Sequence, residues 1–356
     1  MNYIIYVSDD LIRSHTLQNQ THFIKKEKIL TGDRATGQLH LGHFVGSLQQ
    51  RVALQYKYEQ TILVADLQGL TDNGHHPHKV SSNILNVVAD YLAVGIDPNE
   101  TTICLQSAIP ALSELTMYYA NLVSVARLHR NPTVKNEIAG KSFGGSIPTG
   151  FLMYPISQAA DITAFRATLI PVGDDQLPMI EQTNEIVRKL NHVAQDEILV
   201  ECKPLLSKVP RLPSSDGKNK MSKSMGNCIL LNATEKDISK AVKSMYTDPN
   251  HLAVEDPGKI EGNIVFTYLD AFHPDFAYVN ELKCRYQKGG LGDGTTKKIL
   301  EECLQDILKP IRERREMFIS DKAQLIEILR VGSTKSQEES NQVLNDVKQA
   351  FGLNFF

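Results

Sequence analysis

Two histidines three residues apart, His40 and His43, close a glycine-rich segment that runs over 31–43 (TGDRATGQLHLGH). If a helix begins here, both imidazoles share one helical face and can donate hydrogen bonds to phosphate oxygens. The first turn of a helix also offers unpaired N–H groups to an anion. The spacing of a dinucleotide-binding fingerprint or a Walker loop is absent. The segment therefore predicts another kind of nucleotide-phosphate site, with a hydrated or capping histidine pair as the alternative.

The pentapeptide KMSKS over 220–224 is a second candidate for phosphate binding. Its two lysines, Lys220 and Lys223, are three residues apart and can converge on one polyphosphate. The stretch 203–223 contains six Lys or Arg residues and one Asp, so its local charge is positive. A solvated basic linker is the alternative, but a chance match to this pentapeptide downstream of the first segment is improbable.

These residues lie where strands and helices are expected to alternate. The apolar patterning predicts strands over 28–33, 61–67, 101–107 and 168–173, and helices over 41–58, 79–94, 112–129, 151–166 and 175–193. Such alternation implies a parallel sheet with right-handed crossovers, which binds ligands at the carboxyl ends of its strands. The segment 131–150, rich in Gly, Pro and Lys, is expected to be a mobile loop.

Helical patterns dominate after residue 226. They cover 235–246, 262–271, 275–287, 295–317 and 321–351. We therefore expect an α/β protein with three regions: an extension over 1–27, a Rossmann-like catalytic domain with a parallel sheet over 28–225, and a mostly helical C-terminal domain over 226–356.

The composition is that of an ordinary globular protein. Hydrophobic residues make up 42% and charged residues 22% of the 356 residues, and the formal net charge is −3, so any RNA contact must come from local basic patches. The five cysteines form no C-x-x-C pair, which argues against a disulfide framework or a compact resident metal site. No run is apolar enough to span a membrane, and the N-terminus is a poor signal peptide. We expect a cytoplasmic protein.

The two phosphate-binding candidates together resemble the signatures of class I aminoacyl-tRNA synthetases, since 40–43 reads HLGH and KMSKS follows it. Two further patterns, Y-P-x-x-x-A-A-D-I over 154–162 and V-G-x-D-Q over 172–176, resemble the tryptophanyl-tRNA synthetase family. The resemblance covers roughly residues 28–330. It implies ATP-dependent activation of L-tryptophan and transfer to tRNA(Trp), with Mg²⁺ carried by ATP and no further metal. The family forms homodimers in which one tRNA spans both subunits.

The resemblance also assigns roles to individual residues. The residues implied to be catalytic are His40, His43, Lys220 and Lys223. The implied ATP-binding set comprises these four with Thr31, Gly32, Asp33, Arg34, Thr36, Gly37, Gly42, Gly173, Asp174, Asp175, Met221, Ser222 and Ser224. Lys135 or Lys141, both within 131–150, would add a third cation near the pyrophosphate.

The amino-acid site implied by the resemblance consists of Tyr154, Gln158, Asp161, Val172 and Gln176. Asp161 would accept the indole N–H, Tyr154 and Gln176 would hold the ammonium group, and Val172 would line the indole slot. The family often has Met at the position of Gln158, so this wall of the pocket differs.

The physical case for tryptophan rests on Asp161. A carboxylate that faces an apolar slot needs a donor, which the indole N–H supplies and phenylalanine does not. A site built around such a hydrogen bond can reject an analogue without the donor by roughly 10⁴-fold. An aspartate on a helix surface or in a cap is the alternative.

Several alternatives remain open from the sequence. The basic run KPIRERRE over 309–316, with Lys309, Arg312, Arg314 and Arg315, is a candidate for contacts with the anticodon arm or equally a solvated helix face. A tyrosyl-tRNA synthetase, a small nucleotidylyltransferase with an HxGH helix and a non-catalytic regulator are the other functions to consider. The intact histidines and lysines argue against a regulator. The chain contains no tryptophan, although several would be usual at this length.

Overall fold

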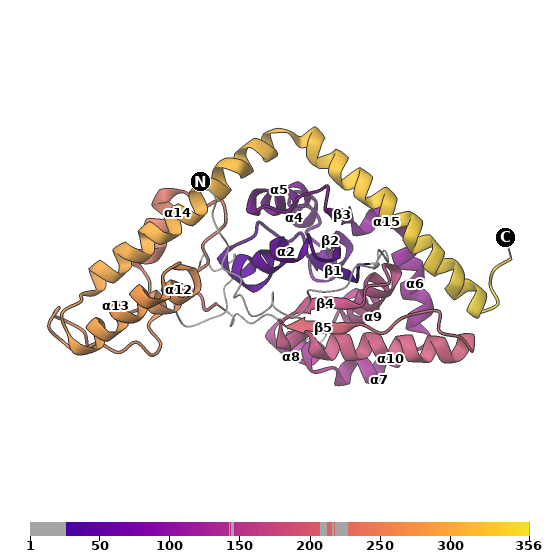
Figure 1. Ribbon diagram of the computed structural model, residues 1–356. Helices are drawn as coiled ribbons and strands as arrows, with labels where there is room; N and C mark the ends of the chain where they lie inside the picture. The colour runs from indigo at the N-terminus through magenta and orange to yellow at the C-terminus, as the bar shows by residue number, and fades with distance from the viewer. Residues whose placement is uncertain are drawn as a thin grey trace, which may run out of the picture.

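A five-stranded, all-parallel sheet lies at the centre of the computed structural model, which describes residues 26–141, 143, 146–206, 212–215, 217 and 227–355 (Figure 1). The strand order is β3-β2-β1-β4-β5. The strands are β1 (Lys28–Asp33), β2 (Glu59–Val64), β3 (Thr101–Leu105), β4 (Leu169–Val172) and β5 (Lys203–Leu206). The predicted parallel sheet is confirmed. The sequence did not predict β5, because its four residues are largely exposed and carry no alternating apolar pattern.

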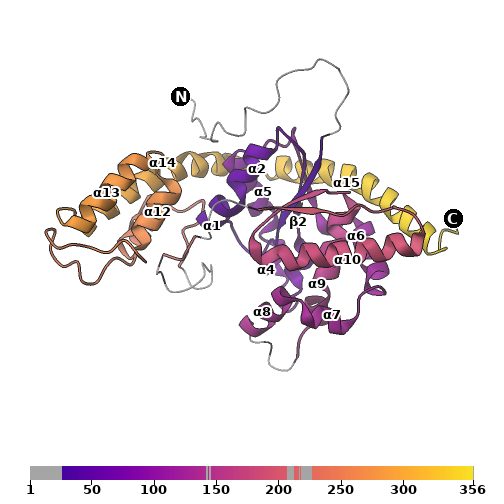
Figure 2. The same ribbon diagram turned by 60° about the horizontal axis from the view of Figure 1, so that its bottom comes forward.

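The side chains of the sheet alternate between two hydrophobic cores. On β2, Ile62 and Val64 enter the core that contains α5 (Ile84–Val94), whereas Leu63 enters the core on the opposite face. Three helices supply half of the buried residues of that second core, namely α6 (Pro110–Ala120), α9 (Thr149–Ala164) and α10 (Leu177–Ala194). The period of two along a strand therefore places helices on both faces of the sheet (Figure 2).

The helix after β1 is continuous but irregular. It comprises α1 (Leu41–His43), a π-helical turn (Phe44–Leu48) and α2 (Gln49–Leu54), within the range that the sequence predicts as one helix. A single π-helical turn inside a helix is often found at a functional site. Two other predicted helices are each divided in two. The shorter helices of this part are α3 (Asp66–Leu70), α4 (His78–Ser81) and α7 (Val125–Arg130).

The prediction that 131–150 is wholly a loop was wrong, because its first part forms α8 (Pro132–Gly140). Asn131 caps this helix by accepting a hydrogen bond from the backbone N–H of Thr133 at 3.0 Å. Pro132 stands in the first turn, where its missing N–H costs nothing. The Gly, Pro and Lys content of the segment concealed this helix start.

Helices make up most of the remaining chain. They are α11 (Glu235–Lys243), α12 (Ile264–Phe272), α13 (Phe276–Lys288), α14 (Asp293–Ser320) and α15 (Lys322–Ala350). The two long helices, α14 and α15, meet at an angle above the sheet, α14 running along α5 and α15 along β3 (Figure 1). The last helix, α15, therefore returns to the sheet and packs against β3, although it follows α11–α14 in the sequence. The division into domains at residue 226 stays a prediction.

Glycine at 332 allows α15 to lie directly on the edge strand β3. A Cβ atom at Gly332 would stand 2.0 Å from the carbonyl oxygen of Ile103, a distance that no side chain tolerates. Beside it, Ser333 Oγ accepts a hydrogen bond from the backbone N–H of Leu105 at 3.0 Å. The helix thus satisfies a donor at the edge of the sheet that would otherwise lack a partner.

The basic run 309–316 is largely used inside the protein. Arg315 is buried and donates from Nε to Asp90 Oδ1 on α5 at 2.5 Å. Arg314 donates to the carbonyl of Ala93, and Arg312 to that of Ala233, both at 2.7 Å. Three of the four cations of this run therefore hold α14 against the rest of the protein, which is not the solvated helix face of the alternative, and contact with the anticodon arm stays a prediction.

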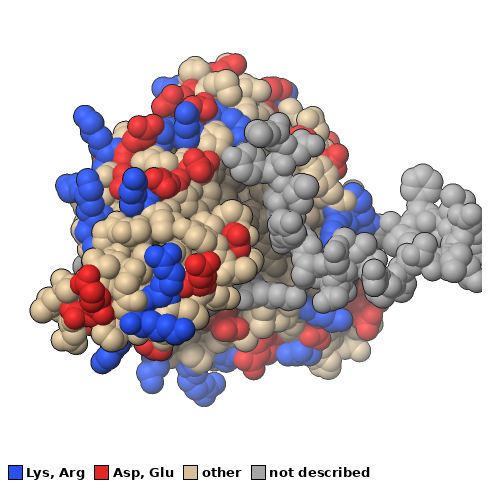
Figure 3. All heavy atoms as spheres, turned by 60° about the vertical axis from the view of Figure 1, so that its left-hand side comes forward, with Lys and Arg blue, Asp and Glu red and all other residues tan. Residues whose placement is uncertain are grey.

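The surface at the helical end shows Lys and Arg interspersed with Asp and Glu, and no broad basic patch is visible on this face (Figure 3). This mixture agrees with the formal net charge of −3. In the part of the chain that the structure describes, no helix combines the length and the apolar character needed to cross a membrane.

Candidate active site

A cavity of about 450 Å³ opens at the carboxyl ends of β1, β2 and β4. This is where a parallel sheet is expected to bind its ligand. Twelve of the residues proposed from the sequence line the cavity: Thr31, Gly32, Asp33, Arg34, Thr36, His43, Tyr154, Gln158, Asp161, Val172, Gly173 and Gln176. Five described candidates do not line it, namely Gly37, His40, Gly42, Asp174 and Asp175. Lys220, Met221, Ser222, Lys223 and Ser224 lie outside the described residues.

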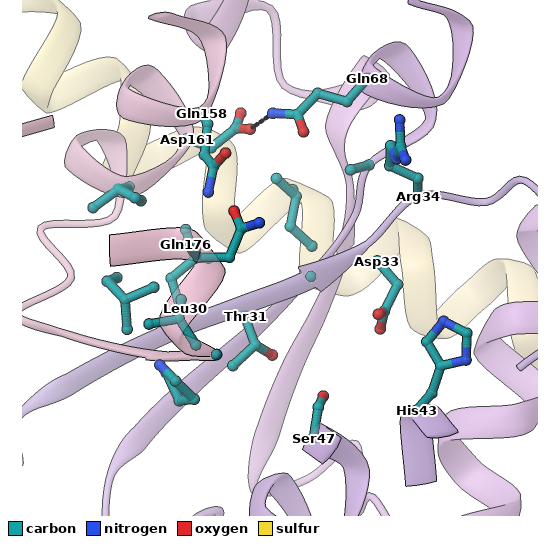
Figure 4. Close-up of a pocket in the computed structure, with 18 of the residues that line it drawn as sticks. Leu30, Thr31, Asp33, Arg34, His43, Ser47, Gln68, Gln158, Asp161 and Gln176 are labelled. Carbon is teal, nitrogen blue, oxygen red and sulfur yellow. Dashed lines mark hydrogen bonds between the residues drawn. The ribbon is translucent and has the colours of Figure 1, made fainter. Parts of the chain in front are cut away.

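The cavity has two differently equipped ends (Figure 4). Asp161, Gln158 and Gln176 lie on one side of β1, and His43 and Ser47 on the other. Gly32 on β1 keeps the floor between them close-packed, because a Cβ there would stand 2.5 Å from the carbonyl oxygen of Leu63. Because the two ends carry different polar side chains, they can bind two different substrates or two chemically different parts of one substrate.

The two histidines of the first motif form a capping pair at the start of α1. His40 is the N-cap residue, and its Nδ1 accepts a hydrogen bond from the backbone N–H of Gly42 at 3.1 Å. His43 Nδ1 in turn accepts from the backbone N–H of His40 at 3.3 Å. The two rings lie 3.9 Å apart between centroids. Because Nδ1 of His43 is used as an acceptor, a neutral ring carries its hydrogen on Nε2, and the ring lines the cavity.

The negative charge of Asp33 is compensated by neighbouring side chains. Arg51 donates to Asp33 Oδ2 at 2.6 Å, and the hydroxyl of Tyr91 donates to the same oxygen at 2.7 Å. Burial alone would raise the pKa of Asp33, but the charges of Arg51 and His43 and the two hydrogen bonds lower it to about 2. The arrangement leaves an ionised carboxylate whose charge is compensated, so it presents little repulsion to a phosphate group. Neither Arg51 nor Tyr91 was selected from the sequence.

Asp161 is buried and held by two glutamine amides. Gln68 Nε2 donates to Oδ2 at 2.7 Å, and Gln106 Nε2 donates to both carboxylate oxygens at 2.9 and 3.0 Å. Burial raises the pKa of Asp161 to about 7, against the lowering effect of these hydrogen bonds, and the charge of Asp66 contributes to the increase. The alternative of a solvated surface aspartate is therefore excluded. The two glutamines fix the orientation of the carboxylate, and the sequence reasoning missed both.

Three hydroxyl groups that line the cavity are buried without a hydrogen-bond partner among the described residues: Thr31 Oγ1, Ser47 Oγ and Tyr154 Oη. A buried hydroxyl without a partner costs free energy of about 1–3 kcal/mol. Hydroxyls of this kind at the wall of a cavity are positions where a ligand restores the lost hydrogen bonds. Ser47 stands at the end of the cavity where His43 lies, and Tyr154 belongs to the same helix as Asp161.

Residues 229–231, which follow the second motif in the sequence, pair with residues 39–41 of the first motif. His40 forms an antiparallel bridge with Leu230, and the backbone N–H groups of Leu41 and Leu231 donate to the carbonyls of Ile229 and Leu39 at 2.9 and 3.0 Å. This pairing begins only a few residues beyond KMSKS. It brings residues 229–231 to the start of α1, although the two segments are distant in the sequence.

The two lysines considered as a third cation differ in their contacts. Lys141 forms an ion pair with Asp72, which also lies 3.6 Å from Arg34, and it stands over the ring of Phe151. Lys135 is exposed on α8. Neither lines the cavity in this structure. The cavity wall contributed by α8 is instead Glu137, which was not selected from the sequence.

Comparison with known proteins agrees with this geometry. The family model described as tRNA synthetases class I (W and Y) matches residues 24–309. Over 336 residues the chain is 55% identical to the tryptophan–tRNA ligase of Clostridium longisporum, covering 93% of this chain and 98% of that protein. The corresponding protein of Lactococcus lactis subsp. lactis is 54% identical over 338 residues, covering 93% of this chain and 99% of that protein.

Among solved structures, the chain resembles the tryptophanyl-tRNA synthetase from Campylobacter jejuni complexed with ADP and tryptophan. The TM-score is 0.81 with 31% sequence identity, and the similarity covers 92% of this chain and all of that chain. The likeness extends over the sheet and the long helices alike, so the two proteins share one overall architecture.

Proposed function

The chain belongs to the class I tRNA synthetases for tryptophan and tyrosine, and from this premise we propose that it is a tryptophan–tRNA ligase. It uses ATP to convert L-tryptophan to tryptophanyl-adenylate, with release of pyrophosphate. It then transfers the tryptophanyl group to the 3′ end of tRNA(Trp), with release of AMP. The relatives with 54 and 55% identity are tryptophan–tRNA ligases, and their sequences are covered almost completely by this chain.

The structural observation that carries this function is the clamped carboxylate of Asp161. Gln68 and Gln106 donate to it with their amide groups, while Asp161 itself lines the cavity. The position suits an acceptor for the indole N–H, with Val172 as part of the apolar wall. A substrate without this donor makes no hydrogen bond to the carboxylate beyond those of the two glutamines, which disfavours phenylalanine.

The opposite end of the cavity is suited to the nucleotide. The His43 ring and the Ser47 hydroxyl lie at this end, and the charge of Asp33 is compensated, so Asp33 repels a phosphate group little. Lys220 and Lys223 of the second motif would add positive charge at the leaving pyrophosphate. Mg²⁺ carried by ATP adds positive charge at the leaving group.

Adenylate formation in this site is mainly a matter of positioning and electrostatics. The tryptophan carboxylate attacks the α-phosphorus of ATP in line, and the bond to the β-phosphate oxygen breaks as pyrophosphate leaves. Lys220 and Lys223 stabilise the charge that develops on the departing group. A hydroxyl of the terminal tRNA adenosine then attacks the carbonyl carbon of the adenylate, and AMP leaves.

The partners and the location follow from this activity. We propose that the helical part around α11–α14 receives the anticodon arm, that two copies of the chain form a dimer spanned by one tRNA, and that the enzyme works in the cytoplasm, where translation takes place. The mixed charge of the helical end means that local groups, rather than a broad basic field, would contact the RNA.

The alternative within the same family is tyrosine activation. ATP–pyrophosphate exchange, measured with each of the twenty amino acids in turn, distinguishes the two. We expect exchange with tryptophan alone. Exchange with tyrosine would move the chain to the tyrosyl branch, and exchange with no amino acid would overturn a role in activation.

A further inference from the structure

Among the described residues three carboxylates line the cavity, and one of them has no cation or amide there to compensate it. Asp33 is paired with Arg51, and Asp161 is held by two glutamine amides. Glu137, half-buried on α8, has neither an ion-pair partner nor an amide donor among the described residues. A carboxylate that faces a cavity without compensation favours a cationic ligand.

The neighbours of Glu137 at the cavity supply further acceptors. Tyr154 Oη is buried and forms no hydrogen bond with the described residues. Tyr154 and Glu137 both line the cavity, and burial, followed by the charge of Glu137, raises the pKa of the Tyr154 hydroxyl. Gln176 lines the same cavity from the turn after β4. A carboxylate, a phenolic oxygen and an amide oxygen together match the three N–H donors of a primary ammonium group.

The structure also fixes the position of Glu137 relative to Gln176. The hydroxyl of Thr133 on α8 donates to the carbonyl of Asp175 at 2.7 Å, one residue before Gln176. The side chain of the cap residue Asn131 is fully buried and donates to Gln182 on α10 at 2.9 Å. Helix α8 is therefore bonded both to the turn that carries Gln176 and to α10, the helix that follows this turn.

We propose that Glu137 is a substrate-binding residue, which together with Tyr154 and Gln176 holds the α-ammonium group of the amino acid and so selects tryptophan over indole acids that lack an amine. The proposal rests on the proposed function, because it assigns a further residue to the same site. A phosphate ligand is unsuited to this wall, since an uncompensated carboxylate repels it, whereas His43 and Ser47 provide donors at the other end.

Three indole ligands test the proposal without requiring turnover. Tryptophan carries both charges, tryptamine carries only the ammonium and indole-3-propionate carries only the carboxylate. Because the chain contains no tryptophan, the ligand is the only indole present, and its emission shift on titration with protein gives the Kd directly. Wild-type protein and the Glu137→Gln and Tyr154→Phe variants are compared, with Glu181→Gln, at an exposed glutamate on α10, as the control for loss of one negative charge.

We expect Glu137→Gln to weaken tryptophan and tryptamine by roughly 10- to 100-fold, the range for a hydrogen bond to a charged group. Indole-3-propionate should bind Glu137→Gln as well as or better than wild type, because the repulsion between carboxylates is removed. Equal weakening of all three ligands would indicate general damage and overturn the proposal, as would unchanged Kd values for tryptophan and tryptamine. If wild-type protein binds no indole at all, the proposed function fails and the inference fails with it.

Discussion

Arg315 on α14 and Asp90 on α5 form a buried ion pair, with Nε and Oδ1 2.5 Å apart. The second oxygen of Asp90 accepts a hydrogen bond from the backbone N–H of Leu39 at 2.8 Å, just before the capping histidines. The next residue on the same helix, Tyr91, donates to Asp33 at the other end of this loop. Consecutive residues of α5 thus hold both ends of the segment 33–39, and Arg315 attaches α14 to the first of these residues, Asp90.

Arg315→Ala is expected to destabilise the fold strongly, because it leaves the Asp90 carboxylate buried without its cation. Removing one partner of a buried pair typically costs about 3–5 kcal/mol of unfolding free energy. Urea unfolding monitored by circular dichroism measures this loss. Arg314→Ala is the matched control, since it removes only the hydrogen bond to the Ala93 carbonyl. Equal losses in the two variants would contradict the importance assigned to the pair.

Lys223→Ala is expected to lower kcat for adenylate formation while leaving the affinity for tryptophan nearly unchanged. The lysine acts on charge that develops in the transition state, and loss of one such donor typically costs roughly 10²–10³-fold in rate. Pyrophosphate exchange under saturating substrates provides the measurement. Lys236→Ala, at an exposed position on α11, is the control. A rate close to that of wild type would remove Lys223 from the mechanism.

His43 combines a cap and a ligand position, and two substitutions separate them. His43→Gln can still reach back to the His40 backbone N–H as in a capping box, so its Tm should stay close to that of wild type. It lacks the imidazole, so its KM for ATP should rise or its activation rate fall. His43→Ala should lose both properties. If His43→Gln activates tryptophan normally, the histidine is only a cap.

Tryptophan affinity should depend on pH through Asp161, because the pKa of this carboxyl is about 7. The ionised form accepts the indole N–H, so the Kd measured by ligand fluorescence should fall as the pH rises from 6 to 8. In Asp161→Asn this dependence should disappear, and discrimination against phenylalanine and tyrosine should decrease. The same pH dependence in both proteins would assign it to another group.

The stability of the fold should respond to the same carboxyl in the opposite sense. The folded pKa of Asp161 lies above its unfolded value of 3.8, so the folded state binds more protons between these values. Unfolding free energy therefore decreases as the pH rises from about 4 to 7 on account of this group. Relative to wild type, Asp161→Asn should gain stability at pH 8 compared with pH 4, as measured by thermal unfolding.

The sequence predicted the fold well, because local patterns carry that information. Apolar runs located four of the strands, and Tyr154 and Asp161 of the further motif line the cavity, while their roles stay a prediction. Gln68 and Gln106 escaped notice because they belong to other segments and converge on Asp161 only in the folded chain. Their positions in the sequence were the available signal. Gln68 and Gln106 follow shortly after β2 and β3, and the carboxyl ends of these strands lie at the edge of the sheet that binds ligands.

The interpretation of charged residues was less successful. Nothing near Arg315 in the sequence reveals Asp90 as its partner, so a basic run on a helix resembles an RNA-binding surface until the packing is known. Glu137 was hidden for a related reason. Its segment has the composition of a loop, although Asn131 and Pro132 together form a recognisable helix start.

The contact between Gly332 and Ile103 also constrains the order of folding during synthesis of the chain. Residues 322–350 are synthesised after all five strands, yet α15 occupies the edge of β3, where a sixth strand would otherwise pair. On the ribosome, the sheet therefore emerges with this edge open and available to other chains. An enzyme that supplies translation with charged tRNA thus depends on one of the later segments of its own translation to close its sheet.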